Sequence, residues 1–201
     1  MQLNPIKITS AVDNIINIID DVYRLIEKKE DYIAFIIIAI GIEFLGAFYD
    51  DKEFTDFSQS EIRFCNGLKN LFKNNWYKQN QSFLFKSFRG PLIHQYRIGS
   101  GILLTSNCKN GASIEEHLKT MDNDRVFVLE GFFEDFKDAA DKFRNSIKGY
   151  HSLNPQKTNM PKYMGIYSTQ STIKGNSDFS LTATNNNVVI KNNTKPKRKS
   201  K

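Results

Sequence analysis

Arg89 and His94 are the two residues whose types and spacing could do chemistry on a phosphate. They stand at the ends of Arg89-Gly90-Pro91-Leu92-Ile93-His94, which follows an aromatic-rich segment with helical spacing. The guanidinium of an arginine offers a planar fork of donors to phosphate oxygens, and a neutral histidine accepts a proton near pH 7. The pair is therefore the first candidate for a functional site.

Pro91 decides whether the two side chains meet. A proline disfavours helical conformation in the residue before it and removes a backbone donor, so the helix carrying Arg89 should end or kink at this point. In an unbroken helix, residues five apart in sequence point ~140° away from each other. The kink therefore either brings Arg89 and His94 together or separates them.

Glu43 is the only charged residue in the apolar segment 32–49, and it is a candidate partner for Arg89. In a functional site, Glu43 would orient the guanidinium. In a purely structural reading, Arg89 neutralises this buried acid and His94 is a satisfied polar residue near the surface. The sequence leaves both readings open.

The net charge of +6 is unevenly distributed along the 201 residues. Residues 1–150 carry 19 basic and 21 acidic residues, whereas residues 151–201 carry nine basic residues and one acidic residue. The basic candidates for nucleic-acid binding lie at the end of the chain: Lys195, Lys197, Arg198, Lys199 and Lys201. Such a run attracts phosphate backbones without reading sequence, and the alternative is a solubilising terminus.

Several kinds of chemistry have no support in the sequence. Cys65 and Cys108 form neither a disulfide framework nor a cluster with metal-ligand spacing. No Gly-Lys-Ser/Thr phosphate loop and no nucleophile-elbow motif is present. We therefore expect no cofactor and no metal. The first residues lack the basic-then-apolar order of a secretory signal, so a cytoplasmic location is expected.

Helical periodicity dominates the first part of the chain. Segment 8–29 has a one-sided apolar stripe, and segment 32–49 is apolar nearly all round. The second segment is just long enough to span a membrane, but Glu43 and acidic flanks favour a buried core helix. Two more helices are expected at about 60–72 and 77–88.

Extended segments interrupt this pattern at about 96–130. Residues 101–105 and 125–129 read as strands of a small antiparallel insert, and residues 132–147 return to helical spacing as a last helix. Residues 151–201 read as a polar, basic and largely flexible tail, in which 164–173 and 179–190 could form the two strands of a hairpin. His117 and His151 have no neighbours in sequence that indicate a ligand or a base, and both are expected to be solvated.

The Arg89 and His94 spacing resembles the Arg-x4-6-His motif of the HEPN superfamily. The aromatic run before Arg89, the continuation His94-Gln95-Tyr96 and the later Phe132-Phe133-Glu134-Asp135-Phe136 also look like a group of uncharacterised bacterial HEPN-like proteins. The resemblance covers residues 1 to about 150. It implies a small helical domain that pairs into a homodimer and acts on RNA.

The resemblance also implies a mechanism. In HEPN ribonucleases, the Arg and His of two protomers face each other, and the 2′-hydroxyl of RNA attacks its own phosphate without a metal. Carried over, His94 would move protons and Arg89 would stabilise charge on the phosphoryl oxygens. A neutralising partner protein is a further expectation for a toxin-like activity.

The sequence thus predicts a mainly α, HEPN-like helical bundle over residues 1–150, with an antiparallel β insert before the last helix and a basic tail. The preferred function is an RNA-directed protein, as a metal-independent endoribonuclease. The alternative is a non-catalytic helical module that binds nucleic acid or a partner protein. Association with a membrane through residues 32–49 is the least favoured reading.

Overall fold

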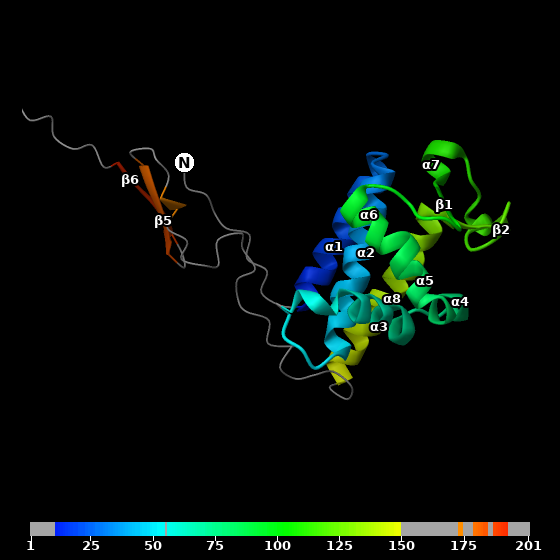
Figure 1. Ribbon diagram of the computed structural model, residues 1–201, viewed down its shortest axis with the longest axis horizontal. Helices are drawn as coiled ribbons and strands as arrows, with labels where there is room; N and C mark the ends of the chain where they lie inside the picture. The colour runs from blue at the N-terminus through cyan, green and yellow to red at the C-terminus, as the bar shows by residue number, and fades with distance from the viewer. Residues whose placement is uncertain (1–10, 55, 150–172, 175–178, 185–186, 193–201) are drawn as a thin grey trace, which may run out of the picture. The chain divides into compact units, whose positions relative to one another are not determined.

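The computed structural model describes residues 11–54, 56–149, 173–174, 179–184 and 187–192, and their side chains within 14–54, 56 and 58–146. The chain divides into two units, one of Ser10–Met160 and one of Met1–Thr9 with Pro161–Lys201. The first unit contains all the described helices and one sheet, and the second contains a separate small sheet (Figure 1).

The helix α2 (Asp31–Gly46) forms the centre of the first unit. It packs against α1 (Ala11–Glu27), α3 (Ser60–Leu71) and α8 (Leu129–Gly149). Ile38, Ile42 and Leu45 are fully buried because neighbours cover the helix on several sides. The expected core helix over 32–49 is therefore present, and it continues into a 3-10 turn, η1 (Ala47–Tyr49).

Two glycines allow α2 and α3 to approach very closely. A Cβ atom on Gly46 would lie 1.7 Å from the carbonyl oxygen of Arg63, and one on Gly67 would lie 2.3 Å from that of Ile42. A larger residue at either position would collide with backbone, which cannot move aside as a side chain can. The loop before α3 contains the 3-10 turn η2 (Phe57–Gln59), whose first turn is capped by Asp56.

A chain of short helices leads from α3 to the motif residues. It consists of α4 (Asn75–Gln79), α5 (Gln81–Leu84), a π-helical turn η3 (Phe85–Arg89) and α6 (Gly90–Gln95). Tyr96 ends α6 in the left-handed conformation, with φ 52°. The extended chain expected at Tyr96 is therefore wrong, because this residue caps a helix.

The β insert is a mixed sheet with the strand order β1-β3-β2, which corrects the expectation of an antiparallel insert. Strand β1 (Ile102–Thr105) runs parallel to β3 (Asp124–Val128), and only β2 (Thr120–Met121) is antiparallel to β3. The connection from β1 passes through α7 (Asn107–Asn110) and the 3-10 turn η4 (Ile114–Glu116). This connection returns the chain to the end of the sheet at which β1 begins, so β3 runs parallel to β1.

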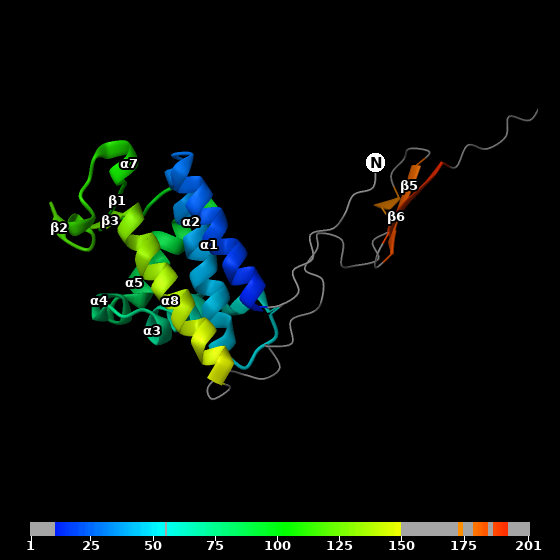
Figure 2. The same ribbon diagram turned by 180° about the vertical axis from the view of Figure 1, so that it is seen from behind.

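The last helix, α8, follows β3 directly and packs back on the bundle, as expected. Seen from behind, it runs alongside α1 and α2 (Figure 2). Its inner face carries a row of buried residues: Phe132, Phe136, Ala139, Ala140 and Phe143. The rings of Phe88, Phe127 and Phe132 contact one another at 5.2–5.8 Å between centroids, so one aromatic cluster joins the helices to the sheet.

The second unit contains an antiparallel sheet with the order β4-β5-β6. Its strands are β4 (Ile173–Lys174), β5 (Phe179–Thr184) and β6 (Asn187–Asn192). The expected hairpin within 164–190 treated 179–190 as one strand, whereas this segment forms β5 and most of β6 paired with each other. Residues 164–172 of that expectation lie outside the described residues.

Candidate functional site

The helix that carries Arg89 changes its hydrogen-bonding pattern just before Pro91. In the π-helical turn η3, the N–H of Gly90 donates to the carbonyl of Phe85, five residues back. In a regular α-helix, the ring of Pro91 would collide with the carbonyl of Ser87. A π turn inserts one extra residue and relieves this collision, so the chain stays helical through Pro91 and does not stop there.

The carbonyl of Ser87 is not left without a partner, although Pro91 has no N–H to offer. The N–H of Gly99 donates to it at 2.8 Å. A Cβ atom on Gly99 would lie 2.9 Å from the Cα of Ser87, so the contact requires a glycine. The segment after α6 is therefore tied to the π turn, and this contact helps to fix where α6 points.

Arg89 lies between Glu43 and His94 and contacts both. Its Nη2 lies 2.5 Å from Oε2 of Glu43, and its Nη1 lies 3.2 Å from Nε2 of His94. The guanidinium carbon also lies 5.5 Å from the centre of the Phe85 ring, within the range of a cation–π contact. Pro91 thus coincides with a geometry that brings Arg89 and His94 together.

The three polar residues of this site differ in their exposure to solvent. Arg89 is 8% exposed, the side chain of Glu43 is 19% exposed, and His94 is exposed. Since an arginine only donates, the contact with Arg89 places a lone pair on Nε2 of His94 and, in the neutral ring, the proton on Nδ1. The His94 ring is therefore accessible to solvent, and the buried guanidinium of Arg89 fixes its orientation.

This arrangement can support proton transfer next to a phosphate, with one restriction. Glu43 already neutralises Arg89, so a phosphate approaching His94 meets an ion pair and not an unpaired cation. Arg89 Nε is buried and has no hydrogen-bond partner among the described residues. One donor of the guanidinium is thus not committed to either neighbour.

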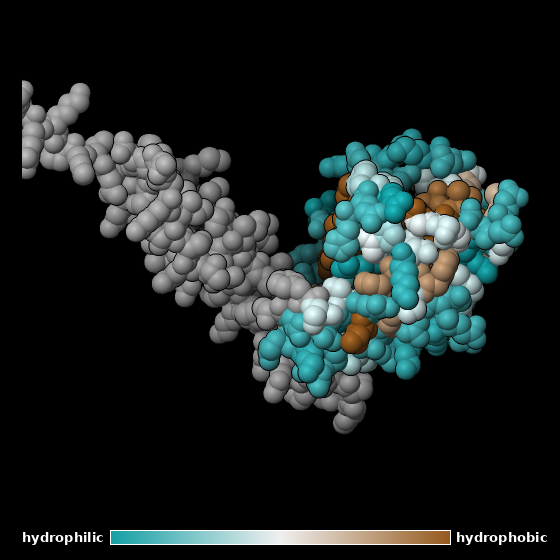
Figure 3. Space-filling view, viewed as in Figure 1, coloured by the Kyte–Doolittle hydropathy of each residue, from teal (hydrophilic) through white to brown (hydrophobic). Residues whose placement is uncertain are grey.

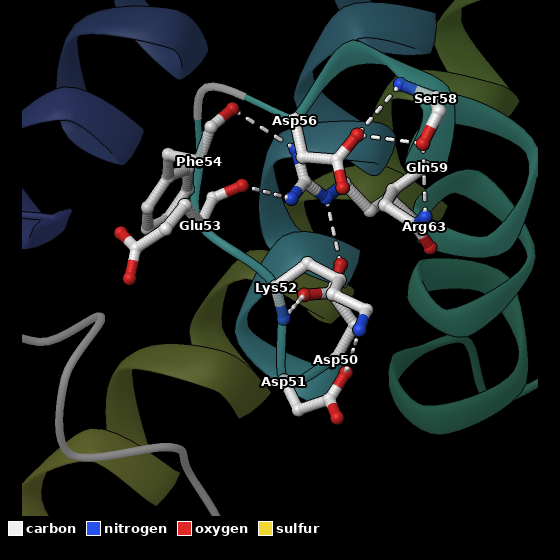
Figure 4. Close-up of polar contacts among 9 residues, drawn as sticks. All are labelled: Asp50, Asp51, Lys52, Glu53, Phe54, Asp56, Ser58, Gln59 and Arg63. Atoms are coloured by element: carbon white, nitrogen blue, oxygen red, sulfur yellow. Dashed lines mark hydrogen bonds and ion pairs between the residues drawn. The ribbon is translucent and has the colours of Figure 1, made fainter.

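A second arginine, Arg63, was not singled out by the sequence reading and is also buried. Its Nε donates to Asp50 at 2.7 Å, and its other nitrogens donate to the carbonyls of Phe54 and Glu53 at 3.0 and 2.5 Å. Figure 4 shows these contacts converging on the guanidinium from the loop between α2 and α3. The acidic run at 50–53 therefore belongs to an ordered loop that binds Arg63.

His117 is not solvated, which corrects the expectation from the sequence. Its side chain is 9% exposed, and its Nε2 lies 2.8 Å from the hydroxyl of Tyr77 and 3.3 Å from Asp135. The N–H of Val128 donates to Nδ1 at 3.1 Å, so in the neutral ring the proton is on Nε2. Gly131, in the first turn of α8, leaves room for the imidazole, since a Cβ there would lie 2.8 Å from its Cγ.

Tyr77 completes this cluster by donating to Asp135 at 2.7 Å. Burial raises the pKa of Tyr77 well above its ordinary value, and the charge of Asp135 and the hydrogen bond to it act in the same direction. The three residues come from α4, the insert and α8. The cluster therefore fastens the insert to the bundle.

The candidate residues of the tail lie outside the described residues: Lys195, Lys197, Arg198, Lys199 and Lys201. His151 lies outside them as well. Among the described residues, no group of three or more His, Cys, Asp or Glu has a geometry that could hold a metal ion.

The segment Asp31–Tyr49 is long and apolar enough to cross a membrane by length and composition alone. In the structure, 56% of its most apolar window is buried inside the protein. A core helix of a soluble protein passes the same test, and α2 has the contacts of such a helix.

No protein-family model, no curated protein and no solved structure matches this chain. The class that the fold and the site define therefore comes from the structure alone. It is a mainly helical protein with a small mixed sheet, in which a largely buried Arg89–Glu43 pair contacts an exposed histidine, His94.

Proposed function

We propose that this chain is an RNA-directed, HEPN-like protein that acts in the cytoplasm as a metal-independent endoribonuclease and as a homodimer. The observation that supports this most is the contact between Arg89 and the exposed His94, at 3.2 Å. A solvent-facing imidazole can transfer protons, and a guanidinium beside it can stabilise negative charge on the phosphoryl oxygens. Cleavage of RNA through its own 2′-hydroxyl needs both functions.

In the proposed reaction, the 2′-oxygen attacks the adjacent phosphorus and the bond from phosphorus to the 5′-oxygen breaks, which leaves a cyclic phosphate. One neutral His94, with its Nε2 released from Arg89, takes the proton of the 2′-hydroxyl, and the protonated His94 of the second protomer gives a proton to the departing 5′-oxygen. Arg89 stabilises the charge that develops on the phosphoryl oxygens.

Exposed apolar side chains near the site support a homodimer. Ile40 of α2 is 43% exposed, and Tyr96 at the end of α6 is 64% exposed. Tyr96 also packs on Tyr32 of α2, with 4.2 Å between ring centroids. Apolar residues interrupt the hydrophilic surface on the face shown in Figure 3. A second copy covering this region would bring two His94 side chains toward each other.

The second candidate is a non-catalytic module that binds nucleic acid or a neutralising partner protein. The burial of Arg89 and its pairing with Glu43 favour this candidate. A guanidinium that is already neutralised contributes less to a phosphoryl transition state than an unpaired one.

A His94→Ala variant separates the two candidates. The parent and the variant are incubated with generic single-stranded RNA in the presence of EDTA, and the cyclic phosphate product is measured. We expect the rate to fall by at least ~100-fold, because a positioned acid or base contributes roughly 10²–10⁴-fold.

The control is Gln95→Ala, which truncates an exposed neighbour on the same helix and should cleave at the parental rate. Equal cleavage by the parent and His94→Ala would exclude the nuclease mechanism. RNA binding by both proteins without any cleavage would favour the non-catalytic module.

A further inference from the structure

The Arg89–His94 site belongs to a segment of the chain that has no acidic residue. Residues 62–114 contain eight lysines and arginines and no aspartate or glutamate. By contrast, α1 carries four acidic residues and one basic residue, and α8 carries five acidic and four basic residues. The slightly negative charge of residues 1–150 is therefore the sum of a basic segment and a more strongly acidic remainder.

The acid-free segment forms one side of the helical bundle, which we call the basic side. It includes most of α3 and all of α4, α5, η3 and α6. In Figure 1, α5 and α6 lie in front of α8, whereas in Figure 2 α1 and α8 lie in front. The positive and negative charges are thus separated between two sides of the bundle as well as along the sequence.

Lys86 lies on the same side of its helix as His94, because of the π turn between them. The chain is helical without interruption from Gln81 to Gln95. The π turn inserts one extra residue, so the step from Lys86 to His94 rotates the chain about as far as seven residues of an α-helix, which is close to two full turns. The two side chains are therefore aligned, roughly 10 Å apart along the helix axis. Both residues are exposed.

Arg97 lies near Lys86, because the chain turns back after α6. The N–H of Gly99 donates to the carbonyl of Ser87 at 2.8 Å, so the segment that contains Arg97 returns to the π turn that contains Lys86. The Nε of Arg97 donates to the side chain of Gln95, and its other donors bond to none of the described residues. The guanidinium is therefore oriented by a neutral amide and keeps its charge available.

Lys86 and Arg97 differ from the basic residues of this segment that already have counterions. Arg63, Lys73 and Arg89 are paired with carboxylates from outside the segment. Lys86 and Arg97 form no ion pair with any described residue, and both are exposed. Such cations are available to phosphates, which a lysine contacts as a point charge and an arginine through its fork of donors.

We propose that Lys86 and Arg97 bind phosphates of an RNA strand next to the phosphate at His94, and so hold the strand in place for the reaction. The inference rests on the proposed function in one respect, since the reaction at His94 makes RNA the ligand. Contacts to phosphates fix the position of a strand without reading its sequence. The basic run near the end of the chain supplies more of the overall attraction, whereas these two cations act beside the site.

The test measures binding and not cleavage. The full chain and its variants are titrated with a strand of about eight 2′-O-methyl uridines, which the proposed reaction cannot cut. Fluorescence anisotropy gives the affinity at several salt concentrations. Each phosphate contact on a single strand contributes ~0.7 to the slope of log affinity against log salt, so Lys86→Gln with Arg97→Gln should lower the slope by at least ~1.4.

Two matched double variants serve as controls. Lys28→Gln with Lys137→Gln removes the same charge from exposed residues just after α1 and on α8, and it should keep the parental slope. Lys86→Arg with Arg97→Lys keeps the charge beside the site and should bind like the parent.

A parental slope in Lys86→Gln with Arg97→Gln would overturn the phosphate site, and so would an equal loss of slope in Lys28→Gln with Lys137→Gln. Either result leaves the nuclease proposal intact if the parent cleaves RNA and His94→Ala does not. A slope that falls only when Lys86 and Arg97 are replaced, in a chain that never cleaves RNA, would retain the phosphate site and remove the nuclease.

Discussion

Arg89 is a mostly buried cation whose neighbours are a carboxylate, an imidazole and an aromatic ring. Glu43 is the neighbour that neutralises its charge, at 2.5 Å. Desolvated ions are costly when they lose their counterion, but replacing both members of a pair by apolar groups is often neutral. Stability and chemistry at this site can therefore be separated by comparing single and double substitutions.

We expect Glu43→Leu to lower the free energy of unfolding by about 3 kcal/mol, because it leaves Arg89 buried and unpaired. The double variant Glu43→Leu with Arg89→Met should recover most of this loss. Urea unfolding of the parent, the single variant and the double variant measures both effects. A double variant no more stable than Glu43→Leu would contradict the view that an unpaired charge causes the loss.

The cleavage assay on the double variant then addresses function. A folded protein of parental stability that has lost cleavage would show that Arg89 and Glu43 serve the reaction. A double variant that cleaves RNA as fast as the parent would show that the pair is only structural.

Tyr77 gives the fold a dependence on alkaline pH. Its pKa is raised in the folded chain by burial and by Asp135, whereas an unfolded tyrosine ionises near ~10. The stability linked to this shift is fully present below the unfolded pKa and is lost as the pH rises through the folded pKa. The parent should therefore lose stability above about pH 10 through this residue.

A Tyr77→Phe variant should be less stable than the parent by about 1–3 kcal/mol at neutral pH, because His117 and Asp135 lose a buried partner. The difference between the two proteins should shrink above pH ~10. Tm measured from neutral to alkaline pH tests this, with Tyr23→Phe as a control that removes an exposed phenol. A constant difference across the pH range would disprove the linkage.

The sequence identified Arg89, His94 and Glu43 because their types are informative without a structure. Glu43 stands out as the single charge in an apolar segment, and the structure pairs it with Arg89. His117 gave no such signal, since its partners are 40 residues before it and 18 residues after it, at Tyr77 and Asp135. Only Gly131, a helix-disfavouring residue near the start of α8, hinted that a side chain packs there.

At the scale of elements, the π-helical turn η3 links the sequence of the motif to its geometry. The rule that a proline disrupts a helix predicted a disturbance at Gly90 and Pro91. It did not predict the form of the disturbance, because the freed carbonyl of Ser87 is satisfied by Gly99, from a segment beyond the helix. A long-range partner of this kind leaves no periodic pattern in the sequence.

We expect Pro91→Ala to restore a regular α-helix, since the new N–H can donate to Ser87 in place of Gly99. Removing the extra residue of the π turn rotates α6 by ~100° relative to Arg89 and moves His94 away from it. Cleavage should fall by about 100-fold, while Tm should change little. The measurements are the cleavage rate and the shift of the His94 ring signal in NMR spectra.

Ser100→Ala is the control for this variant, because Ser100 is exposed, follows Gly99 in the loop after α6, and its substitution leaves Pro91 in place. Parental cleavage by Pro91→Ala, with an unshifted His94 signal, would show that the π turn does not position the histidine.

The long helices α1, α2, α3 and α8 were predictable from their apolar spacing. The single helix expected at 77–88 was wrong, because this segment is divided into α4, α5 and the π turn η3, and the topology of the insert was not predictable either. Strands β1 and β3 were both recognised, but their parallel pairing depends on the excursion through α7 and η4. Local sequence patterns indicate which segments form strands, but they do not indicate whether two strands pair in the parallel or the antiparallel direction. The same limit explains why 179–190 reads as one strand and forms two.

At the scale of the whole molecule, the charge is divided between two parts of the sequence. Residues 1–150 carry 19 basic and 21 acidic residues, a net charge of −2, and the remainder carries +8. The part that contains Arg89 and His94 therefore does not attract RNA by its overall charge. The proposed function requires that the basic run near the end of the chain supplies most of the non-specific attraction.

Neutralising that run should reduce the salt dependence of RNA binding. Each phosphate contact on a single strand contributes ~0.7 to the slope of log affinity against log salt, so five charges contribute up to ~3.5. The variant replaces the five basic residues with glutamine: Lys195, Lys197, Arg198, Lys199 and Lys201. A matched variant with arginine at the four lysines keeps the charge and should keep the slope. If the glutamine variant retains the parental slope, the phosphate contacts lie elsewhere, and the helical part must bind RNA despite its own net negative charge.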